Sequence, residues 1–186
     1  MESELSIRQL ERSELGDIWL IDRSELIDGY YVLREGKLVA VEEQFDLKGW
    51  PPGEEEHFAP HLIDCFDRGG SFIGAFDGGT LVGIAVLESR LIGSRLDRLQ
   101  LKFLHVGQPY RGRGLGTRLF RLAEAKAREL GARTLYISSN PSKHTVGYYT
   151  SLGCKLAEEV DPELFELEPE DIHMEYVISS ERPMEK

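Results

Sequence analysis

Residues 106–117 read VGQPYRGRGLGT, and they join a strand-like segment to a long helical one. Alternating glycines leave the backbone without Cβ atoms, so successive N–H groups can turn toward one anion. The start of a helix adds a partial positive charge, and two arginines add full charges. The stretch therefore predicts a loop that binds phosphate or pyrophosphate. Its candidate residues are Arg111, Gly112, Arg113, Gly114, Leu115, Gly116 and Thr117.

The spacing of the glycines distinguishes this loop from two well-known phosphate-binding loops. A P-loop needs a lysine and a hydroxyl residue after its last glycine, but Gly116 is followed by Thr117 and Arg118. A dinucleotide fingerprint needs G-x-G-x-x-G and an acid at the end of the next strand. Here the spacing is G-x-G-x-G, and the next strand, residues 134–139, ends in serines. A third pattern, R/Q-x-x-G-x-G, fits Arg111, Gly114 and Gly116.

Charge is distributed unevenly along the chain. The net charge of −11 over 186 residues argues against a nucleic-acid partner. Residues 90–133 nevertheless hold eleven Lys and Arg against three acids, whereas residues 154–186 hold eleven acids against three bases. A basic run is often only a solvated helix face, but here it surrounds the glycine loop and favours an anion site.

Composition narrows the class of protein further. Hydrophobic residues make up 41% and charged residues 30%, which is typical of a globular protein. Two cysteines without zinc spacing favour a reducing compartment, and we expect a cytoplasmic protein. No apolar run is long enough to span a bilayer, and the first residues lack the apolar segment of a secretory signal, so no membrane association is expected.

Periodicity and turn residues predict an alternation of strands and helices. Glu35-Gly36 and Asp77-Gly78-Gly79 indicate two hairpins, and Gly131 and Gly153 mark two helix ends. The predicted strands are 5–10, 30–34, 37–42, 71–76, 80–88, 97–106, 134–138 and 172–178. One helix is predicted to start after a cap at Ser13, and three others are predicted over 54–67, 115–130 and 142–152.

With the loop pattern in this order of elements, the chain resembles the GCN5-related N-acetyltransferases, the GNAT superfamily, over roughly residues 71–156. The resemblance implies an α/β (α+β) GNAT acyl-CoA acyltransferase fold, with a mixed central sheet flanked by helices and splayed central strands. We interpret residues 1–186 as a single GNAT domain. Residues 1–70 are an N-terminal elaboration with an extra hairpin, 71–156 the acetyl-CoA-binding core, and 157–186 a C-terminal acidic loop and strand.

The resemblance also implies a reaction. Acetyl-CoA is the co-substrate, with its pyrophosphate on the loop and its pantetheine along Leu104, His105 and Val106. A backbone N–H of that strand would polarise the thioester carbonyl. A neutral primary amine of a small molecule or peptide would attack the thioester directly in a ternary complex. Two alternatives remain: a non-catalytic acyl-CoA-binding sensor or partner module, and a transferase of a longer acyl group or to a hydroxyl.

Five residues in or beside the helix predicted over 142–152 matter for this chemistry. Tyr149 matches the family's tyrosine and is the candidate general acid, with packing on the sheet as the alternative role. Tyr148 is expected to pack. The family's cofactor-binding asparagine falls on Ser142, which would bind the cofactor or only cap the helix, and Asn140 lies close by but out of register. Cys154 replaces the usual phenylalanine and is expected to pack as a small apolar residue.

The general base is not identified by the sequence. The family's base positions correspond to Gln100 and Lys102, which are poor proton acceptors, and strand alternation should turn His105 away from both. Acidic residues at Glu42, Glu43 and 54–56 could act through water, or the substrate could need no dedicated base. The acceptor wall is expected in residues 30–43, 50–58 and 160–171, whose acids favour a cationic amine. His57 and His61 lack a third ligand, so no metal is expected, and a homodimer is compatible with the family.

Overall fold

The computed structural model describes residues 5–179. Within them, seven strands form one sheet in the order β1-β6-β7-β8-β9-β11-β10, and two further pairs form small ribbons. The pairing is antiparallel except between β8 and β9. The sheet consists of β1 (Ser6–Gln9), β6 (Ser71–Asp77), β7 (Thr80–Ile92), β8 (Arg98–Val106), β9 (Thr134–Ser139), β10 (Lys155–Leu156) and β11 (Ile172–Val177).

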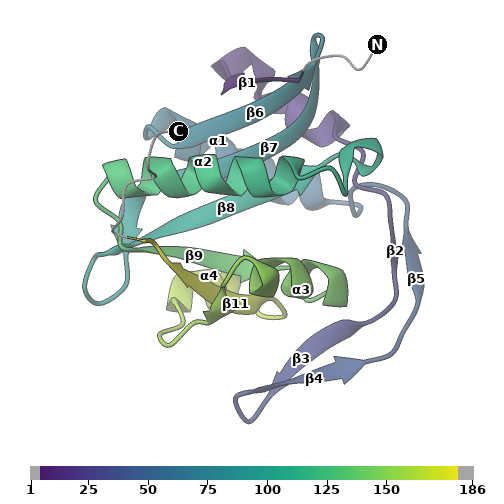
Figure 1. Cartoon of the computed structure of the whole chain (residues 1–186), viewed down its shortest axis with the longest axis vertical. Coiled ribbons are helices and arrows are strands. Elements are labelled where there is room, and N and C mark those ends of the chain that lie inside the picture. The colour runs from purple at the N-terminus through teal and green to yellow at the C-terminus, as the bar shows by residue number, and fades with distance from the viewer. Residues whose placement is uncertain (1–4, 180–186) are drawn as a thin grey trace.

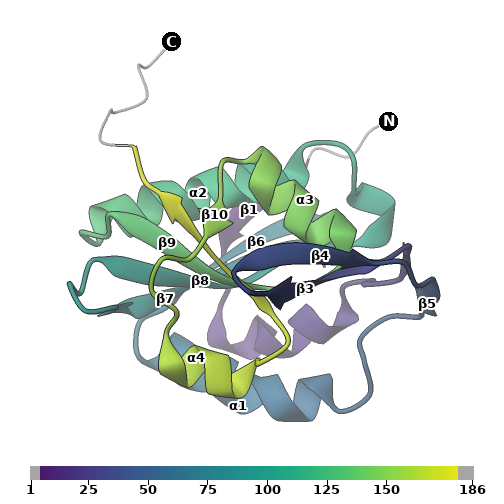
Figure 2. The ribbon, with the colours of Figure 1, turned by 90° about the horizontal axis from the view of Figure 1, so that it is seen from below.

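Helices cover both faces of this sheet (Figures 1 and 2). On one face lie α2 (Leu115–Glu129) and α3 (Lys143–Ser151). On the other lie α1 (Glu54–Asp67), α4 (Pro162–Leu167) and the 3-10 helix η1 (Arg12–Leu20). A second 3-10 turn, η2 (Gln108–Tyr110), follows β8.

Two apolar clusters hold these layers together. The larger cluster packs the buried side of α2, including Leu119 and Phe120, and Val146 of α3 against the sheet. The smaller cluster lies on the opposite face and joins η1 and α1 to β6, β7 and β8 through residues such as Ile18 and Phe72. Both faces of the central strands are thus covered, which explains why β6 and β7 are continuous apolar runs.

The first seventy residues contribute more to the fold than an elaboration would. β1 pairs with β6 at the edge of the main sheet, and η1 and α1 cover one face of it. Within residues 5–70, the segment 25–47 forms an extended arm made of β2 (Glu25–Ile27), β3 (Tyr30–Arg34), β4 (Lys37–Val41) and β5 (Phe45–Leu47) (Figure 1).

Most predicted elements are present, and the differences have local causes. The helix expected from Ser13 is a 3-10 helix capped by Glu11, whose side chain and that of Glu14 form a reciprocal capping box. β7 extends beyond residue 88 to Ile92. The segment expected as a loop at 160–171 contains α4, which begins with Pro162 after the capping carboxylate of Asp161.

The parallel pair β8 and β9 separates after a short contact. Its register runs from Arg98↔Thr134 to Gln100↔Tyr136 and then stops, whereas β8 stays paired with β7 up to Val106. Beyond Gln100, the edge of β8 that faces β9 is therefore unpaired. Unpaired backbone groups at such an edge are available to a ligand that adds along the strand.

A β-bulge sits on β8 at the start of this separation. Leu101 pairs with Leu87 and Phe103 with Val86, so β8 has one extra residue, Lys102, against its partner. As a result, the neighbouring side chains Lys102 and Phe103 both contact groups on the α1 side of the sheet. The bulge also turns His105 to that side, so the simple alternation expected from the sequence is wrong here.

Candidate functional site

The glycine loop connects β8 to α2 and presents free backbone donors. Gly112 and Gly114 have φ values of +72° and +79°, where L side chains are strained, and a Cβ on either would meet only open space. Arg118 is the first residue of α2 bonded to a carbonyl of this turn, with its N–H 3.0 Å from the Gly114 oxygen. The N–H groups of the residues between Gly114 and Arg118 have no acceptor within the helix. These features suit an anion at the helix start.

The two loop arginines differ in their surroundings. The Arg111 guanidinium donates to the carbonyls of Val106 at 2.9 Å and Ser24 at 3.0 Å, so it braces the loop against the start of the arm. It is therefore engaged by protein atoms, although the sequence suggested a charge directed at phosphate. Arg113 is exposed to solvent at the tip of the loop. Of the two loop arginines, Arg113 is therefore the one whose guanidinium is available to an anion from solution.

The strand that leads into the loop presents the separated edge described above. Leu104, His105 and Val106 pair on one side with Ala85, Ile84 and Gly83 of β7. Their other side faces the gap toward β9. The three residues predicted to bind pantetheine thus line the open edge of β8, directly before the glycine loop.

Two neighbouring tyrosines of α3 have different environments. Tyr149 is only 6% exposed and packs beside Phe120 of α2, with ring centroids 6.4 Å apart. Burial raises the pKa of Tyr149 above its usual value, so the phenol stays protonated at neutral pH. The Tyr148 hydroxyl is buried beside Thr117, 3.2 Å from where a Cβ on Gly116 would lie. Tyr148 therefore reaches the first turn of α2, which the sequence did not predict.

The two candidates for binding the cofactor's amide are engaged within the start of α3. The Ser142 hydroxyl accepts the Thr145 N–H at 3.1 Å and donates to Thr145 Oγ1 at 2.8 Å, so it caps the helix as one of its predicted roles requires. The Asn140 side chain accepts the Ser142 N–H at 3.0 Å. The arm docks on this segment, because the Tyr31 N–H donates to the Pro141 carbonyl at 2.8 Å.

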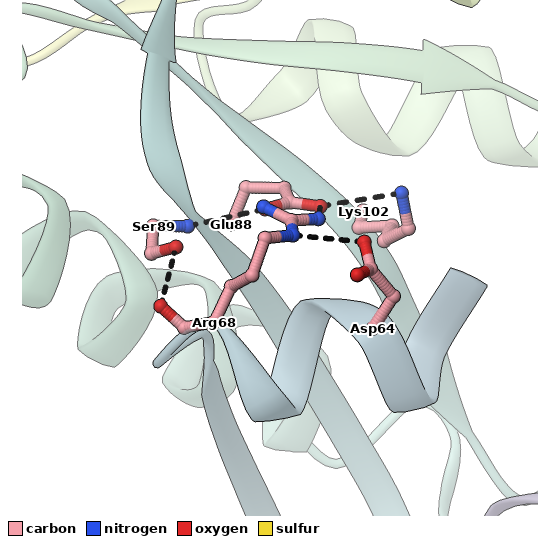
Figure 3. A network of polar contacts seen from close by, with 5 residues as sticks. All are labelled: Asp64, Arg68, Glu88, Ser89 and Lys102. Atoms are coloured by element: carbon pink, nitrogen blue, oxygen red, sulfur yellow. Dashed lines mark hydrogen bonds and ion pairs between the residues drawn. The ribbon is translucent and has the colours of Figure 1, made fainter. Parts of the chain in front are cut away.

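Lys102, in the bulge, belongs to a charged network on the α1 side of the sheet (Figure 3). Its ammonium lies 3.5 Å from the Glu88 carboxylate, which accepts two hydrogen bonds from Arg68 at 2.9 and 3.0 Å. Arg68 also donates to Asp64 at 2.8 Å. Burial raises the pKa of Glu88, but Arg68 and Lys102 outweigh burial and lower it overall. Lys102 is thus a charged partner of Glu88.

Aromatic side chains surround His105 on the same side. Its ring centroid is 4.8 Å from that of Trp50 and 5.1 Å from that of Phe103. Burial, followed by the cations of Arg23 and Arg111, lowers the pKa of His105 well below its usual value. The imidazole is therefore neutral at physiological pH.

Two partly buried carboxyl groups belong to the acidic segment 160–171, on the face of the sheet that carries α1 and α4. Glu168 ends α4 and Asp171 precedes β11. Burial, and the repulsion between the two, raises the pKa of Glu168 to about 7, while burial raises that of Asp171 to about 6. Glu54 of α1, which forms an ion pair with Arg23, contributes to both shifts. The sequence marked the segment 160–171 as part of the acceptor wall but did not distinguish these two acids from their neighbours, because their burial depends on contacts with distant elements.

The remaining sequence candidates lie apart from this region or take other roles. Glu42 pairs with Lys143 at 2.9 Å in the docked arm. His57 and His61 are ring neighbours on α1, and no metal-binding group of three or more side chains occurs within residues 5–179. In the same range, no helix is long and apolar enough to cross a membrane. Cys65 and Cys154 are buried free thiols, and burial raises the pKa of each to about 12.

Comparison with known proteins matches the part of the chain that contains the glycine loop and α3. The family model described as the Acetyltransferase (GNAT) family matches residues 36–154. No curated protein sequence matches the chain. The structure resembles nourseothricin acetyltransferase, with 22% identity, a TM-score of 0.70, and coverage of 94% of this chain and 99% of that chain.

Two other solved structures resemble this one at similarly low sequence identity. The ribosomal-protein-S18-alanine N-acetyltransferase of Escherichia coli has 18% identity and a TM-score of 0.58, covering 98% of this chain and 99% of that chain. An acetyltransferase from Brucella melitensis, solved with acetyl-CoA, has 17% identity and a TM-score of 0.58, covering 100% of this chain and 95% of that chain. At these identities the likeness establishes the fold.

Proposed function

The chain belongs to the acetyltransferase (GNAT) family, and we propose that it transfers the acetyl group of acetyl-CoA to a primary amine of a small molecule or peptide. One observation carries the proposal. β8, whose edge toward β9 is unpaired after Gln100, leads directly into the glycine loop at the start of α2. Acetyl-CoA needs an open strand edge for its pantetheine arm, followed directly by an anion-binding loop for its pyrophosphate.

The chain offers complementary groups along that path. Backbone N–H groups from Gly112 to Thr117 bind the pyrophosphate, and Arg113 adds a cation, whereas the Arg111 N–H is engaged by the Gln108 carbonyl at 3.3 Å. The open edge of Leu104, His105 and Val106 binds the pantetheine amides as an added strand would. Ser142 and Asn140, at the start of α3, remain candidates for contacts with the cofactor's amide. The Brucella acetyltransferase that shares this fold was solved with acetyl-CoA.

The reaction is a direct transfer in a ternary complex. The acceptor ammonium loses one proton, and the free amine attacks the thioester carbonyl. The C–N bond forms and the C–S bond breaks. The attacking nitrogen then loses a second proton, and the departing thiolate gains one, so charge and protons balance. One of the backbone N–H groups of Leu104, His105 and Val106 polarises the carbonyl oxygen, which lowers the barrier to attack.

Tyr149 is our candidate for the proton donor to the thiolate. Its raised pKa keeps the hydroxyl protonated across neutral pH, as a general acid requires. Tyr148 reaches the first turn of α2 and provides a natural control. Tyr149→Phe should lower kcat by about 10²-fold with little change in acetyl-CoA affinity, whereas Tyr148→Phe should act mainly on that affinity. Equal kcat in wild type and Tyr149→Phe would exclude the donor role.

The acceptor is proposed to approach from the face that carries α1 and α4. Trp50 and Phe58 supply apolar surface beside β8, and Glu54, Glu168 and Asp171 supply carboxyl groups. Carboxylates at the entrance attract a cation, which favours a positively charged amine over a neutral or anionic one. Nourseothricin acetyltransferase and the ribosomal-protein-S18-alanine N-acetyltransferase share the fold, so a small molecule and a peptide amine are both compatible with it.

The test is an acetyl-transfer assay on the purified full chain. Acetyl-CoA is mixed with matched panels of cationic, neutral and anionic primary amines, free thiol release is followed, and the acetylated product is identified by mass. We expect transfer, with the cationic amines preferred. Preference for anionic acceptors would contradict the acceptor class, and thiol release without an acetylated amine would contradict amine transfer itself.

A further inference from the structure

We propose that the ion pair between Lys102 and Glu88 fixes the β8 bulge and thereby sets the direction of the open strand edge that binds the pantetheine arm. Lys102 and Glu88 are positioning residues in this proposal, because they act through the β8 backbone rather than on the substrate. This inference rests on the proposed function, since it concerns the same strand edge.

Two irregularities lie next to each other on β7 and β8. Leu87 pairs with Leu101, and on one side of this pair β8 carries the extra residue Lys102. On the other side, residues 88–90 of β7 stand opposite a single residue of β8. Lys102 and Glu88 therefore each belong to the irregular part of their own strand. Their charged atoms, Nζ and Oε1, lie 3.5 Å apart.

The bulge decides which face each later side chain of β8 occupies. Before it, Leu99 and Leu101 lie in the larger apolar cluster on the α2 side. After it, Phe103 lies in the smaller cluster, and His105 contacts Trp50 on the α1 side. Without the extra residue the later side chains would exchange faces, because a shift of one residue turns every side chain over. The position of the bulge therefore also decides which of the later backbone N–H groups face the gap toward β9.

The charge on Lys102 ties the bulge to one position. Its side chain is only 10% exposed, and the next residue, Phe103, is part of the smaller apolar cluster. A buried ammonium is costly without a counter-ion, and Glu88, 9% exposed, supplies one. Moving the extra residue along β8 would part these two charges and leave both buried without each other. The ion pair thus selects a single register of β8 against β7.

Glu88 is itself held by the end of α1 (Figure 3). Its carboxylate oxygens accept hydrogen bonds from Arg68 at 2.9 and 3.0 Å and from the Ser89 N–H at 3.2 Å. The Ser89 hydroxyl donates to the Arg68 carbonyl at 3.1 Å, and the Arg68 N–H donates to the Asp64 carbonyl at 3.0 Å. The counter-ion of Lys102 is therefore fixed to α1, on the face from which the acceptor is proposed to approach.

The separation of β8 from β9 begins beside this ion pair. Gln100↔Tyr136 is the last pair between the two strands, and the bulge follows two residues later. A bulge bends its strand, so this one turns β8 away from β9 while pairing with β7 continues to Val106. With the pyrophosphate held at the start of α2, the direction of residues 104–106 sets where the thioester carbonyl meets its polarising N–H. A misplacement of about 1 Å can lower the rate by about 10²-fold.

The experiment is a double-mutant cycle on the purified full chain, with Lys102→Met, Glu88→Gln and both together. We measure kcat with the best cationic acceptor, and acetyl-CoA affinity by calorimetry, at a temperature at which melts show every variant folded. Each single variant should lower kcat by about 10- to 10²-fold and change acetyl-CoA affinity by less than about threefold. The double variant should be no slower than the slower single variant, because the two residues act as one unit.

Two control variants separate positioning from lost stability. Leu10→Ala truncates a buried side chain of the smaller cluster beside β1, which β6 and β7 separate from β8. It should lower Tm but keep the wild-type kcat. Lys102→Arg keeps a cation at the bulge and should hold kcat within about threefold of wild type. Amide hydrogen exchange over residues 98–106 should be faster in Lys102→Met than in Leu10→Ala, because only the former loses the local ion pair.

Three kinetic outcomes would overturn the inference and leave the transferase function standing. If Lys102→Met lowers kcat and Glu88→Gln does not, Lys102 acts on the substrate rather than on the strand. If the two fold-changes multiply in the double variant, the residues act independently. If Leu10→Ala loses as much kcat, the effect is one of stability alone. If wild type acetylates no amine, the proposed function is wrong, and amide exchange then decides alone: unchanged exchange in Lys102→Met would show that the ion pair does not hold the bulge.

Discussion

Replacing Glu88 by Gln tests how the charged network beneath the β8 bulge stabilises the fold. Glu88 is 9% exposed and accepts two hydrogen bonds from Arg68, and it is the ion-pair partner of Lys102, itself 10% exposed. Glutamine has nearly the same shape but no charge. The variant therefore leaves a buried ammonium and a partly buried guanidinium without their shared counter-ion.

The expected cost can be estimated from burial. Removing one partner of a buried ion pair costs about 3–5 kcal/mol. Arg68 keeps its bond to Asp64 and is 22% exposed, so we expect the lower end, about 3 kcal/mol. For a protein of this size, that loss corresponds to a fall in Tm of about 6–12 °C.

Urea unfolding at neutral pH measures this loss, with Asp64→Asn as the control. The Asp64 side chain is 67% exposed, so its loss should cost less than about 1 kcal/mol. Because the folded-state pKa of Glu88 is lowered, its contribution is present above the ordinary carboxyl pKa and is lost as the pH falls through the folded value. A loss for Glu88→Gln no larger than that for Asp64→Asn would refute this reasoning.

Three other predictions concern stability and reactivity. The Glu168 pKa is raised from 4.5 to about 7 in the folded state, so ionisation destabilises the fold as pH rises through this window. Glu168→Gln should therefore be more stable than wild type by about 1–3 kcal/mol at pH 8 but not at pH 4, and urea unfolding showing the same gap at both would contradict this. Ser142→Ala removes the α3 cap and should cost about 1–2 kcal/mol by the same method; no loss would mean that the cap is dispensable. Cys65 and Cys154, with pKa values of about 12, should react with a thiol reagent only after unfolding, and rapid labelling of the native protein would show that they are accessible.

The glycine loop and most elements follow from the sequence because their signals are local. Gly114 and Gly131 bracket α2, and the apolar spacing of α2 predicts its buried side. The N-terminal strand β1 was predicted as an element, but its place at the edge of the main sheet was not, since pairing with β6 joins residues far apart in the chain.

The acceptor side of the site was harder to predict for a physical reason. The bulge at Lys102 adds one residue to β8 and reverses the alternation that the sequence implied for His105. Glu168 and Asp171 look like ordinary members of an acidic segment until the fold buries them near Glu54 of α1. Neither the bulge nor this burial leaves a pattern in a single sequence.

The central claim is that the start of α2 binds the pyrophosphate of acetyl-CoA, and a matched pair of glycine variants tests it most directly. Gly114 and Gly131 lie at opposite ends of α2, both with positive φ and both with open space where a Cβ would be. Valine at either position should cost a similar amount of stability, about 1–2 kcal/mol. Calorimetric titration with acetyl-CoA should show at least tenfold weaker binding for Gly114→Val and unchanged binding for Gly131→Val. Equal affinity in wild type and Gly114→Val would contradict the claim.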